Sequence, residues 1–230
     1  MVAPLPYPDP EPQNNKESTL KKLLCILGLL GVITAPSLAL DPASLDIKVY
    51  KFAASTSEYC TDPVTVFTDS SPDYQNMLDN PEFGSGSLDD GTYECVIIEM
   101  SDRIKFTPDG SSGSCTDGET ITMDVCRERD GEESETAMLV DGTEVTCDNS
   151  ENRVAIFLST ATIEPESEEE DGPNAFYPPT SSENNGIELL NSLVVAGTSS
   201  GVLSIDTDDT LDGTEAECEM NKPTFSFSTD

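Results

Sequence analysis

Cysteine is the residue that most limits the folds open to this chain. The sequence has 230 residues, with seven cysteines and no histidine. Cys25 lies in an apolar segment, and the other six are too widely spaced for the tight C-x₂-C pairs of zinc sites. In an exported chain an even set of cysteines indicates disulfide bonds, here three, for which fifteen connectivities are possible. The residues expected to form them are Cys60, Cys95, Cys115, Cys126, Cys147 and Cys218.

The N-terminal region predicts export. A pair of lysines ending at Lys22 precedes the apolar run Leu23–Thr34, and a segment of small residues ends at Ala39. This order of charged, apolar and small residues is typical of a secretory signal peptide, with cleavage after Ala39. The alternative is a membrane anchor over Leu23–Leu40, but Pro36 interrupts that run before it reaches the ~20 apolar residues of a spanning helix. We therefore expect a periplasmic, cell-surface or secreted protein with no membrane span after cleavage.

The charge of the chain restricts its partners. There are 45 Asp and Glu against 11 Lys and Arg, for a formal charge of −34. Such acidity repels nucleic-acid phosphates and anionic membranes, which excludes both as partners. It suits solubility in salt, binding of cations, or an unknown protein or surface partner. The absence of any N-x-[ST] glycosylation site favours a bacterial source.

Short apolar runs with a period of two predict an all-β fold. About nine or ten strands separated by turn residues, with no helical period, indicate an antiparallel β-sandwich with long acidic loops. The runs cover residues 44–55, 63–68, 93–100, 103–108, 119–126, 137–147, 152–163, 187–197, 201–206 and 224–229.

Four of these regions allow sharper predictions. The run Tyr93–Met100 is apolar on both faces, which favours a central strand, and residues 103–108 should pair back with it as a hairpin. The pair Asp141-Gly142 between two strand-like runs predicts a hairpin with a two-residue type I′ turn. Ser71, Pro72 and Pro81 allow a short helix between strands. Residues 187–195 could also be helical, but their valines and flanking glycines favour strand.

The domain organisation follows from one acidic, Pro-rich stretch. Residues 1–39 form the signal with its N-terminal extension, and residues 40–163 form the main β-sandwich block. Residues 164–186 lack periodicity and should be a mobile loop or linker. Because Cys218 lies beyond it, we expect residues 187–230 to complete the same domain; two independent domains are the alternative.

One short stretch carries a family resemblance. The unit L-x-x-G-x-Y, here Leu88, Gly91 and Tyr93, resembles a turn-to-strand unit of prealbumin-like β-sandwiches, which include the carboxypeptidase regulatory and transthyretin-like modules. In that arrangement the glycine makes the turn and the tyrosine enters the sandwich, while its hydroxyl bonds a polar group at the rim. The resemblance implies a sandwich fold and a non-catalytic binding or spacer role.

Residue types exclude most catalytic chemistry. Without histidine, no Ser-His-Asp or Cys-His arrangement can form. No G-x-S-x-G nucleophile motif, P-loop or dinucleotide fingerprint occurs. A hydrolase that uses two carboxylates is compatible with the composition, because any fold can bring two acidic residues together. We assign no catalytic residue and no cofactor other than a possible calcium ion.

One segment has features of a calcium site. Residues Asp208–Glu219 match an EF-hand loop at its first, fifth, sixth and twelfth positions, but Thr210 stands at the third and no amphipathic helix flanks the segment. A simpler calcium loop between strands would use Asp206, Asp208 and Asp212. The alternative is an ordinary acidic turn.

The sequence therefore predicts an exported, acidic, non-catalytic β-sandwich that acts as a structural or binding module with an unknown ligand. A calcium-dependent adhesion or matrix component is the second hypothesis, and a secreted carboxylate-based hydrolase is the third.

Overall fold

The computed structural model describes residues 39–79, 86–127, 136–163, 173–197, 201–214 and 217–229. These residues belong to one compact unit and contain strands, turns and no helix. The predicted signal segment, apart from Ala39, lies outside the described residues.

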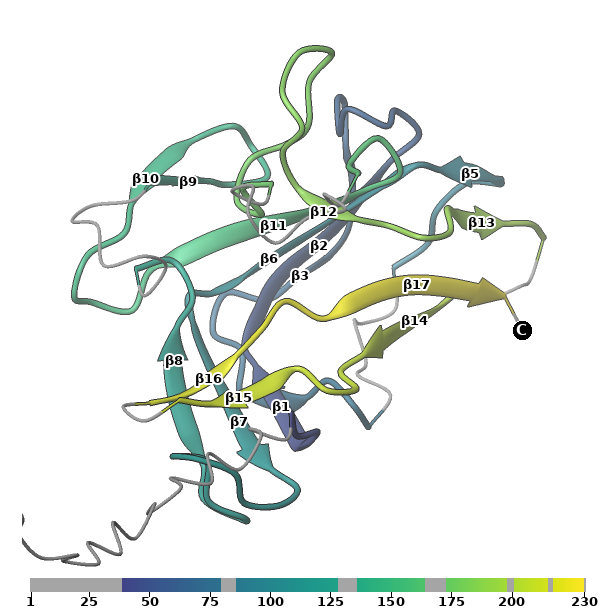
Figure 1. The fold of residues 1–230 in the computed structure, drawn as a ribbon. Helices are drawn as coiled ribbons and strands as arrows, with labels where there is room; N and C mark the ends of the chain where they lie inside the picture. The colour runs from purple at the N-terminus through teal and green to yellow at the C-terminus, as the bar shows by residue number, and fades with distance from the viewer. Residues whose placement is uncertain are drawn as a thin grey trace, which may run out of the picture. The chain divides into compact units, whose positions relative to one another are not determined.

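The larger sheet has five strands in the order β12-β11-β6-β2-β3 (Figure 1). Its β11–β12 contact is parallel, and the other three pairs are antiparallel. The strand bounds are β2 Val49–Ser55, β3 Val64–Thr68, β6 Cys95–Ser101, β11 Arg153–Ser159 and β12 Ile187–Glu188.

A second, four-stranded sheet has the order β4-β1-β7-β8 and is antiparallel throughout. Its strands are β1 Pro42–Ile47, β4 Gln75–Asn76, β7 Arg103–Pro108 and β8 Ile121–Asp124. The other strands form antiparallel pairs: β5 Gly91–Tyr93 with β13 Leu193–Val195, β9 Thr136–Met138 with β10 Glu144–Thr146, β14 Gly201–Asp206 with β17 Thr224–Thr229, and β15 Leu211–Gly213 with β16 Cys218–Met220.

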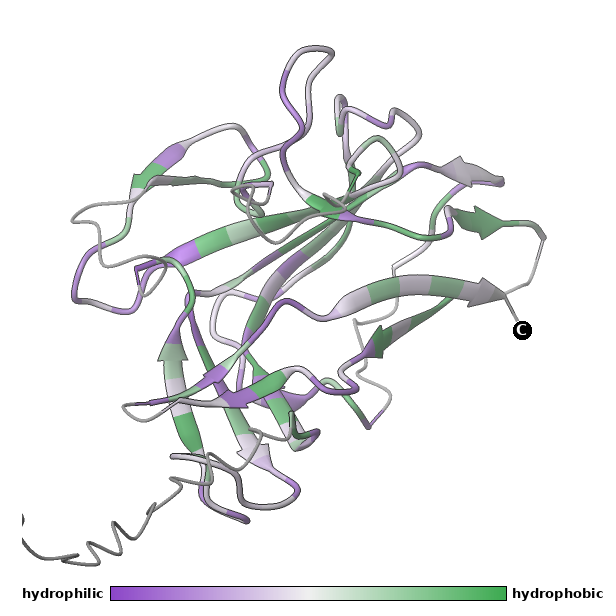
Figure 2. Cartoon of the chain, in the orientation of Figure 1, coloured by the Kyte–Doolittle hydropathy of each residue, from purple (hydrophilic) through white to green (hydrophobic). Residues whose placement is uncertain are grey.

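Strand β6 is the centre of the larger sheet, as predicted. All seven of its residues are buried. Val96, Ile98 and Met100 belong to the main core cluster, whereas Cys95 and Ile97 belong to a smaller cluster with residues of β2 and β11. In Figure 2 the strands of this sheet are green, meaning hydrophobic, where they converge near β12. Burial on both faces explains why the run is apolar without alternation.

The two sheets are joined by a ribbon of two strands that bends. Strand β1 continues into β2 after Lys48, and β6 continues into β7 after Asp102. β1 pairs with β7 in one sheet and β2 pairs with β6 in the other, and the N–H of Ser101 bonds the carbonyl of Lys48 at the bend. A register shift between Val49 and Lys51 adds a bulge there. Bulges of this kind let strands switch between sheets.

This bend corrects two predictions. Residues 44–55 form two strands in different sheets instead of one, and residues 103–108 pair with β1 and β8 instead of folding back on β6. A hairpin between β6 and β7 would need a turn built on residues such as Asn-Gly. Ser101-Asp102 lacks that chemistry, and the chain bends into the second sheet instead.

The predicted hairpin after residue 135 is confirmed, but its turn type is different. β9 pairs with β10, the N–H of Leu139 bonds the carbonyl of Thr143, and the N–H of Gly142 bonds the carbonyl of Leu139. Gly142 has φ of 82°, whereas Asp141 does not have a positive φ. A type I′ turn requires positive φ at both central residues, so the connection is the three-residue kind that ends in a left-handed glycine.

The short helix allowed over residues 71–81 does not form in the described part of that segment, residues 71–79. Gln75 and Asn76 instead pair with β1 as strand β4. The side-chain oxygen of Asn76 accepts N–H bonds from Leu45 and Leu78, at 3.1 Å each. Asparagine side chains that bond backbone groups in this way compete with helix formation.

Residues 173–186 differ from the mobile loop that their composition predicts. Phe176 is only 5% exposed and belongs to the main core cluster. Its carbonyl accepts the N–H of Met138 in β9, and the neighbouring carbonyl of Ala175 accepts the N–H of Phe157 in β11. The acidic residues 164–172 lie outside the described residues. The segment after them therefore packs as part of the fold.

The C-terminal segment is also joined to the earlier strands. The Cys115–Cys218 disulfide links residues separated by 103 positions in the sequence. Residues 187–195 contain the two strands β12 and β13, in agreement with the preference for strand over helix. The all-β class and the disulfide bonds are confirmed, while the sandwich arrangement and the domain boundaries stay predictions.

Candidate ligand-binding cavity

A cavity of about 670 Å³ lies among the residues of both sheets. Strands β1, β7 and β8 contribute to its walls from one sheet, and β6, β11 and β12 from the other. The rest of the lining comes from the segment from β16 into β17 and from Met77, Val125, Pro173, Ala175, Phe176 and Ile205. Ligand pockets in proteins typically have volumes of about 300–1,000 Å³ and mostly apolar linings, so this cavity has the size and character of a ligand site.

Methionine is prominent in the lining. Met77, Met100, Met123 and Met220 all contribute, each from a different strand or turn. Met77, Met100 and Met220 are at most 8% exposed. Because methionine has an unbranched, flexible side chain with a polarizable sulfur, it adapts to ligands of different shape and contacts aromatic rings favourably.

Polar groups are concentrated at one side of the cavity. Glu219, Asn221 and Lys222 line it there, and all three are exposed, so solvent reaches the cavity at this side. A smaller hollow of about 190 Å³ adjoins it and is lined by Ile187, Lys222 and Pro223, which both hollows share, together with Glu188 and Thr224. The cavity is therefore apolar inside, with one polar end.

Sequence reasoning did not identify this cavity. Ile98, Met100 and Ile156 read in the sequence as ordinary core positions of strands, and Phe176 fell in a predicted linker. The chain has only six methionines, of which four line the cavity. That concentration could be recognised only after the strands were placed in space.

The six predicted cysteines form three disulfides, Cys60–Cys95, Cys115–Cys218 and Cys126–Cys147. Disulfides persist in oxidising compartments, which agrees with an extracellular type of environment. The Cys115–Cys218 bond lies directly before Glu219 and so anchors the polar side of the cavity to the turn at residues 112–115.

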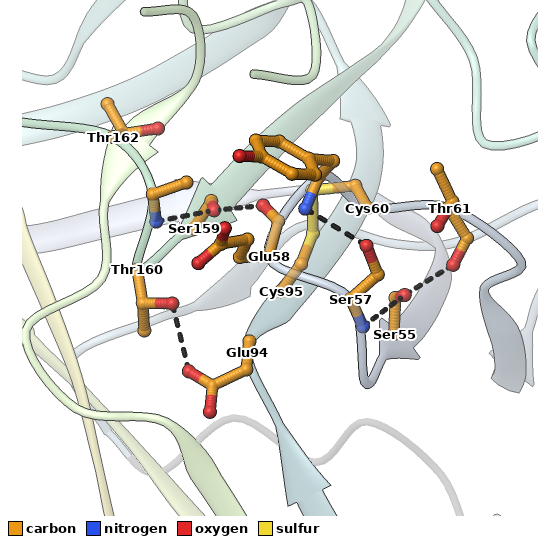
Figure 3. The surroundings of a disulfide bond; sticks show 12 residues. Ser55, Ser57, Glu58, Cys60, Thr61, Glu94, Cys95, Ser159, Thr160 and Thr162 are labelled. Atoms are coloured by element: carbon orange, nitrogen blue, oxygen red, sulfur yellow. Dashed lines mark hydrogen bonds between the residues drawn. A yellow bond between two sulfur atoms is a disulfide. The ribbon is translucent and has the colours of Figure 1, made fainter. Parts of the chain in front are cut away.

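Serine hydroxyls hold the loop beside the Cys60–Cys95 disulfide (Figure 3). Ser55 donates to the carbonyl of Thr61, and Ser159 donates to the carbonyl of Glu58, so the loop is held from both β2 and β11. Cys60 has φ of 56°, a left-handed conformation that is uncommon for residues other than glycine. The disulfide and the two serines fix this loop against the larger sheet.

A buried carboxylate lies on the other side of the larger sheet from Val96 and Ile98. Glu99 is 1% exposed and forms ion pairs of 3.2 Å with both Lys51 and Arg153. The Arg153 guanidinium also stacks over the ring of Tyr50, at 4.0 Å from its centre. The N–H of Val140 donates to Glu99 at 3.4 Å, which joins the β9–β10 hairpin to the sheet. These contacts give Glu99 a structural role.

Two more buried carboxylates lie at the bend of the ribbon. Asp102 is fully buried and Asp124 is 7% exposed. Burial raises the pKa of Asp102, and the charge of Asp124 raises it further. The N–H of Asn152 donates a hydrogen bond of 2.8 Å to Oδ1 of Asp102, which opposes the rise. A hydrolase needs carboxylates that reach its substrate. Burial of both side chains keeps this pair away from solvent.

The three predicted calcium ligands occupy neighbouring elements. Asp206 ends β14, Asp208 lies in the following turn, and Asp212 lies in β15. The charges of Asp206 and then Asp41 raise the pKa of Asp208, so these carboxylates repel one another. Within the described ranges no three or more acidic or cysteine side chains gather as a metal site. The segment that resembles an EF-hand loop contains β15 and most of β16, which pair as antiparallel strands, and the calcium loop stays a prediction.

No protein-family model matches this chain, and comparisons with curated proteins and with solved structures find no significant match. Among the residues that the structure describes, none forms a helix long and apolar enough to cross a membrane.

Proposed function

We propose that this chain is an exported, non-catalytic binding module that holds one apolar small molecule in the methionine-lined cavity. The observation that carries the proposal is the cavity itself, with a volume of about 670 Å³ and a lining drawn from both sheets. A volume in this range with a largely apolar lining is typical of small-molecule pockets, which supports a ligand here.

The resemblance to prealbumin-like modules supports a non-catalytic role. Tyr93 is 5% exposed, and its hydroxyl donates to the carbonyl of Asp89 at 2.9 Å. The buried ring and its hydroxyl bond agree with what the resemblance implies for Tyr93, whereas Gly91, which it places in the turn, begins strand β5 and has no positive φ. Such modules mostly bind or space other groups. Disulfides and the predicted signal support an exported location.

The test is titration of the oxidised chain with phenylnaphthylamine, a neutral apolar dye whose fluorescence rises in apolar surroundings. Saturable binding of one dye per chain, with a negative heat-capacity change in calorimetry, is expected for burial of an apolar ligand. Ala175 lines the cavity, and an Ala175→Trp substitution fills it with an indole. This variant should weaken binding by about tenfold or more, equivalent to ~1.4 kcal/mol.

The matched control is Thr92→Trp, which adds the same ring at an exposed position of β5 that is not part of the lining. It should bind the dye as the natural chain does. Circular dichroism and urea unfolding establish that both variants fold. Absence of saturable binding, or equal binding by both folded variants, would refute the proposal.

A calcium-dependent adhesion or matrix component is the second proposal. The charges of Asp206 and Asp41 that raise the pKa of Asp208 support it, because a divalent cation beside Asp208 would relieve that repulsion. The test is the thermal midpoint in EDTA and then in millimolar calcium at fixed ionic strength. A rise of several degrees that sodium does not reproduce supports a specific site coupled to folding. An unchanged midpoint rejects it.

A further inference from the structure

The polar end of the cavity carries information about the ligand. In strand β16 and the residues after it, Met220 is 8% exposed and Phe225 is 5% exposed, whereas Glu219 and Lys222 are exposed. All of them line the same cavity. A ligand whose apolar part lies against Met220 and Phe225 therefore has its other end beside Glu219, Asn221 and Lys222.

The charge at this end is negative. Glu219 lines the cavity and Glu188 lines the adjoining hollow, while Lys222 lines both. The formal charges of these three lining side chains sum to one negative unit. The formal charge of the whole chain, −34, has the same sign. At the ionic strength of physiological solutions, charges act over about 8 Å, so the nearby carboxylates have the largest effect on a ligand here.

We infer that the cavity binds a single-chain amphiphile whose alkyl chain fills the methionine-lined interior and whose polar head lies at Glu219–Lys222, with cationic heads preferred over neutral heads and neutral heads over carboxylates. This inference rests on the proposed function, because it requires that the cavity takes an apolar ligand. It adds the shape of the ligand, the direction in which it lies and the charge of its head.

An apolar molecule without a head would leave the polar end in contact with water alone. An alkyl chain with a head removes its methylene groups from water, which is favourable, and keeps its polar group hydrated. An alkylammonium head is attracted by Glu219 and Glu188, and an alkylcarboxylate head is repelled by them. Because the end is exposed to solvent, the difference is modest and sensitive to salt.

The test compares decylamine, decanol and decanoate, which have the same alkyl length and differ in head charge. Dissociation constants are measured by calorimetry with the oxidised chain, at neutral pH, below micelle-forming concentrations and at low and high sodium chloride. At low salt decylamine should bind about fivefold more tightly than decanol, and decanoate about fivefold more weakly, as expected for charges near a protein surface. High salt should bring the three constants together.

The variant Glu219→Gln should remove most of the preference for decylamine over decanol at low salt, since the formal charges of Glu188 and Lys222 then cancel. The control is Glu183→Gln, which changes the net charge equally at an exposed residue that lines neither hollow. It should keep the preference of the natural chain. Decanol binding should be the same in all three proteins.

The outcomes separate this inference from the proposed function. If decanol binds but decanoate binds as tightly as decylamine, or if the order survives in high salt, the inference is wrong and the apolar cavity site stands. Equal effects of Glu219→Gln and Glu183→Gln would likewise overturn it. If decanol, decylamine and the dye all fail to bind, the proposed function fails with it.

Discussion

Gly113 and Gly213 lie so close together that a Cβ atom on Gly113 would stand 1.9 Å from the carbonyl oxygen of Gly213. Conversely, a Cβ atom on Gly213 would lie 1.9 Å from the carbonyl oxygen of Ser112. Gly213 pairs with Cys218 across the β15–β16 hairpin, and Cys218 is bonded to Cys115. Backbone contact and disulfide thus join the same two segments, and they position the wall that contains Glu219 and Met220.

This contact predicts that Gly213→Ala destabilises the protein. The new methyl group would meet backbone atoms, which cannot move aside as a flexible side chain can, so the hairpin must shift. Overpacking of this kind costs about 1–3 kcal/mol. Gly91→Ala is the matched control, because its Cβ would meet nothing closer than 3.8 Å and its φ is not positive. Urea unfolding measures both, and a loss of stability no larger for Gly213→Ala than for Gly91→Ala would contradict the contact.

The disulfides predict an order of stabilisation. The Cys115–Cys218 bond closes a loop of 103 residues, whereas Cys126–Cys147 closes one of 21. In the loop-entropy account, long loops of ~100 residues contribute about 4.7 kcal/mol and short ones of ~15 about 3 kcal/mol. Replacing both cysteines of the longer bridge by alanine should therefore lower the free energy of unfolding more than the same change in the shorter one.

Two measurements check this prediction. Mass spectrometry of a non-reduced digest identifies which peptides are joined, and a Cys115 peptide bonded to anything other than Cys218 would reject the pairing. Urea unfolding of the two double-alanine variants then gives the order. All four cysteines are buried or half-buried, so the comparison is made between similar environments.

Asp102 predicts a dependence of stability on pH. Burial raises the pKa of its carboxyl above the ordinary value, so the folded protein holds this proton more tightly than the unfolded chain does. The stabilisation that protonated Asp102 contributes is fully present below the unfolded-state pKa of about 4. It is lost as the pH rises through the higher pKa of the folded state. Asp102→Asn removes the ionisation, so stability should fall less steeply above pH ~4 than in the natural chain.

The control for this prediction is Asp117→Asn, which removes one negative charge at an exposed residue. It lowers the general repulsion of the acidic chain by the same charge without changing the buried site. Urea unfolding at several pH values from acidic to neutral compares the three slopes. If the free energy of unfolding has the same slope against pH in Asp102→Asn and Asp117→Asn, the burial of Asp102 does not cause the pH dependence.

Features that depend on residues close together in the sequence were predicted correctly. Apolar residues on both faces of Cys95–Ser101 indicate a central strand whatever its partners are, and the even cysteine set indicates disulfides whatever their pairing is. The turn after Val140 was placed correctly but given the wrong type. Asp-Gly is compatible with more than one hairpin turn, and the backbone angles that distinguish them depend on how the strands join.

The remaining features depend on contacts between distant parts of the chain. Asp102 reads as a polar turn residue between two strand runs, yet it is fully buried where the ribbon bends. Its environment is set by Asn152, which is 50 residues away in the sequence, and by Asp124. The cavity likewise combines residues from Leu45 to Phe225. The strand residues among them read as ordinary core positions and Phe176 reads as part of a linker, so no local pattern indicates that together they surround an open volume.

Phe176 lies in a packed segment that follows an acidic stretch of the chain, and its burial predicts a large effect on stability. Its ring is 5% exposed in the main core, although residues 164–186 have the composition of a linker. Phe176→Ala should cost about 3–5 kcal/mol, as for other large aromatic side chains removed from a core. Ile163→Ala, at a side chain that is 71% exposed, should change stability by no more than ~0.5 kcal/mol. Urea unfolding compares the two, and a change of less than ~1 kcal/mol in Phe176→Ala would mean that residues 173–186 behave as the linker their composition predicts.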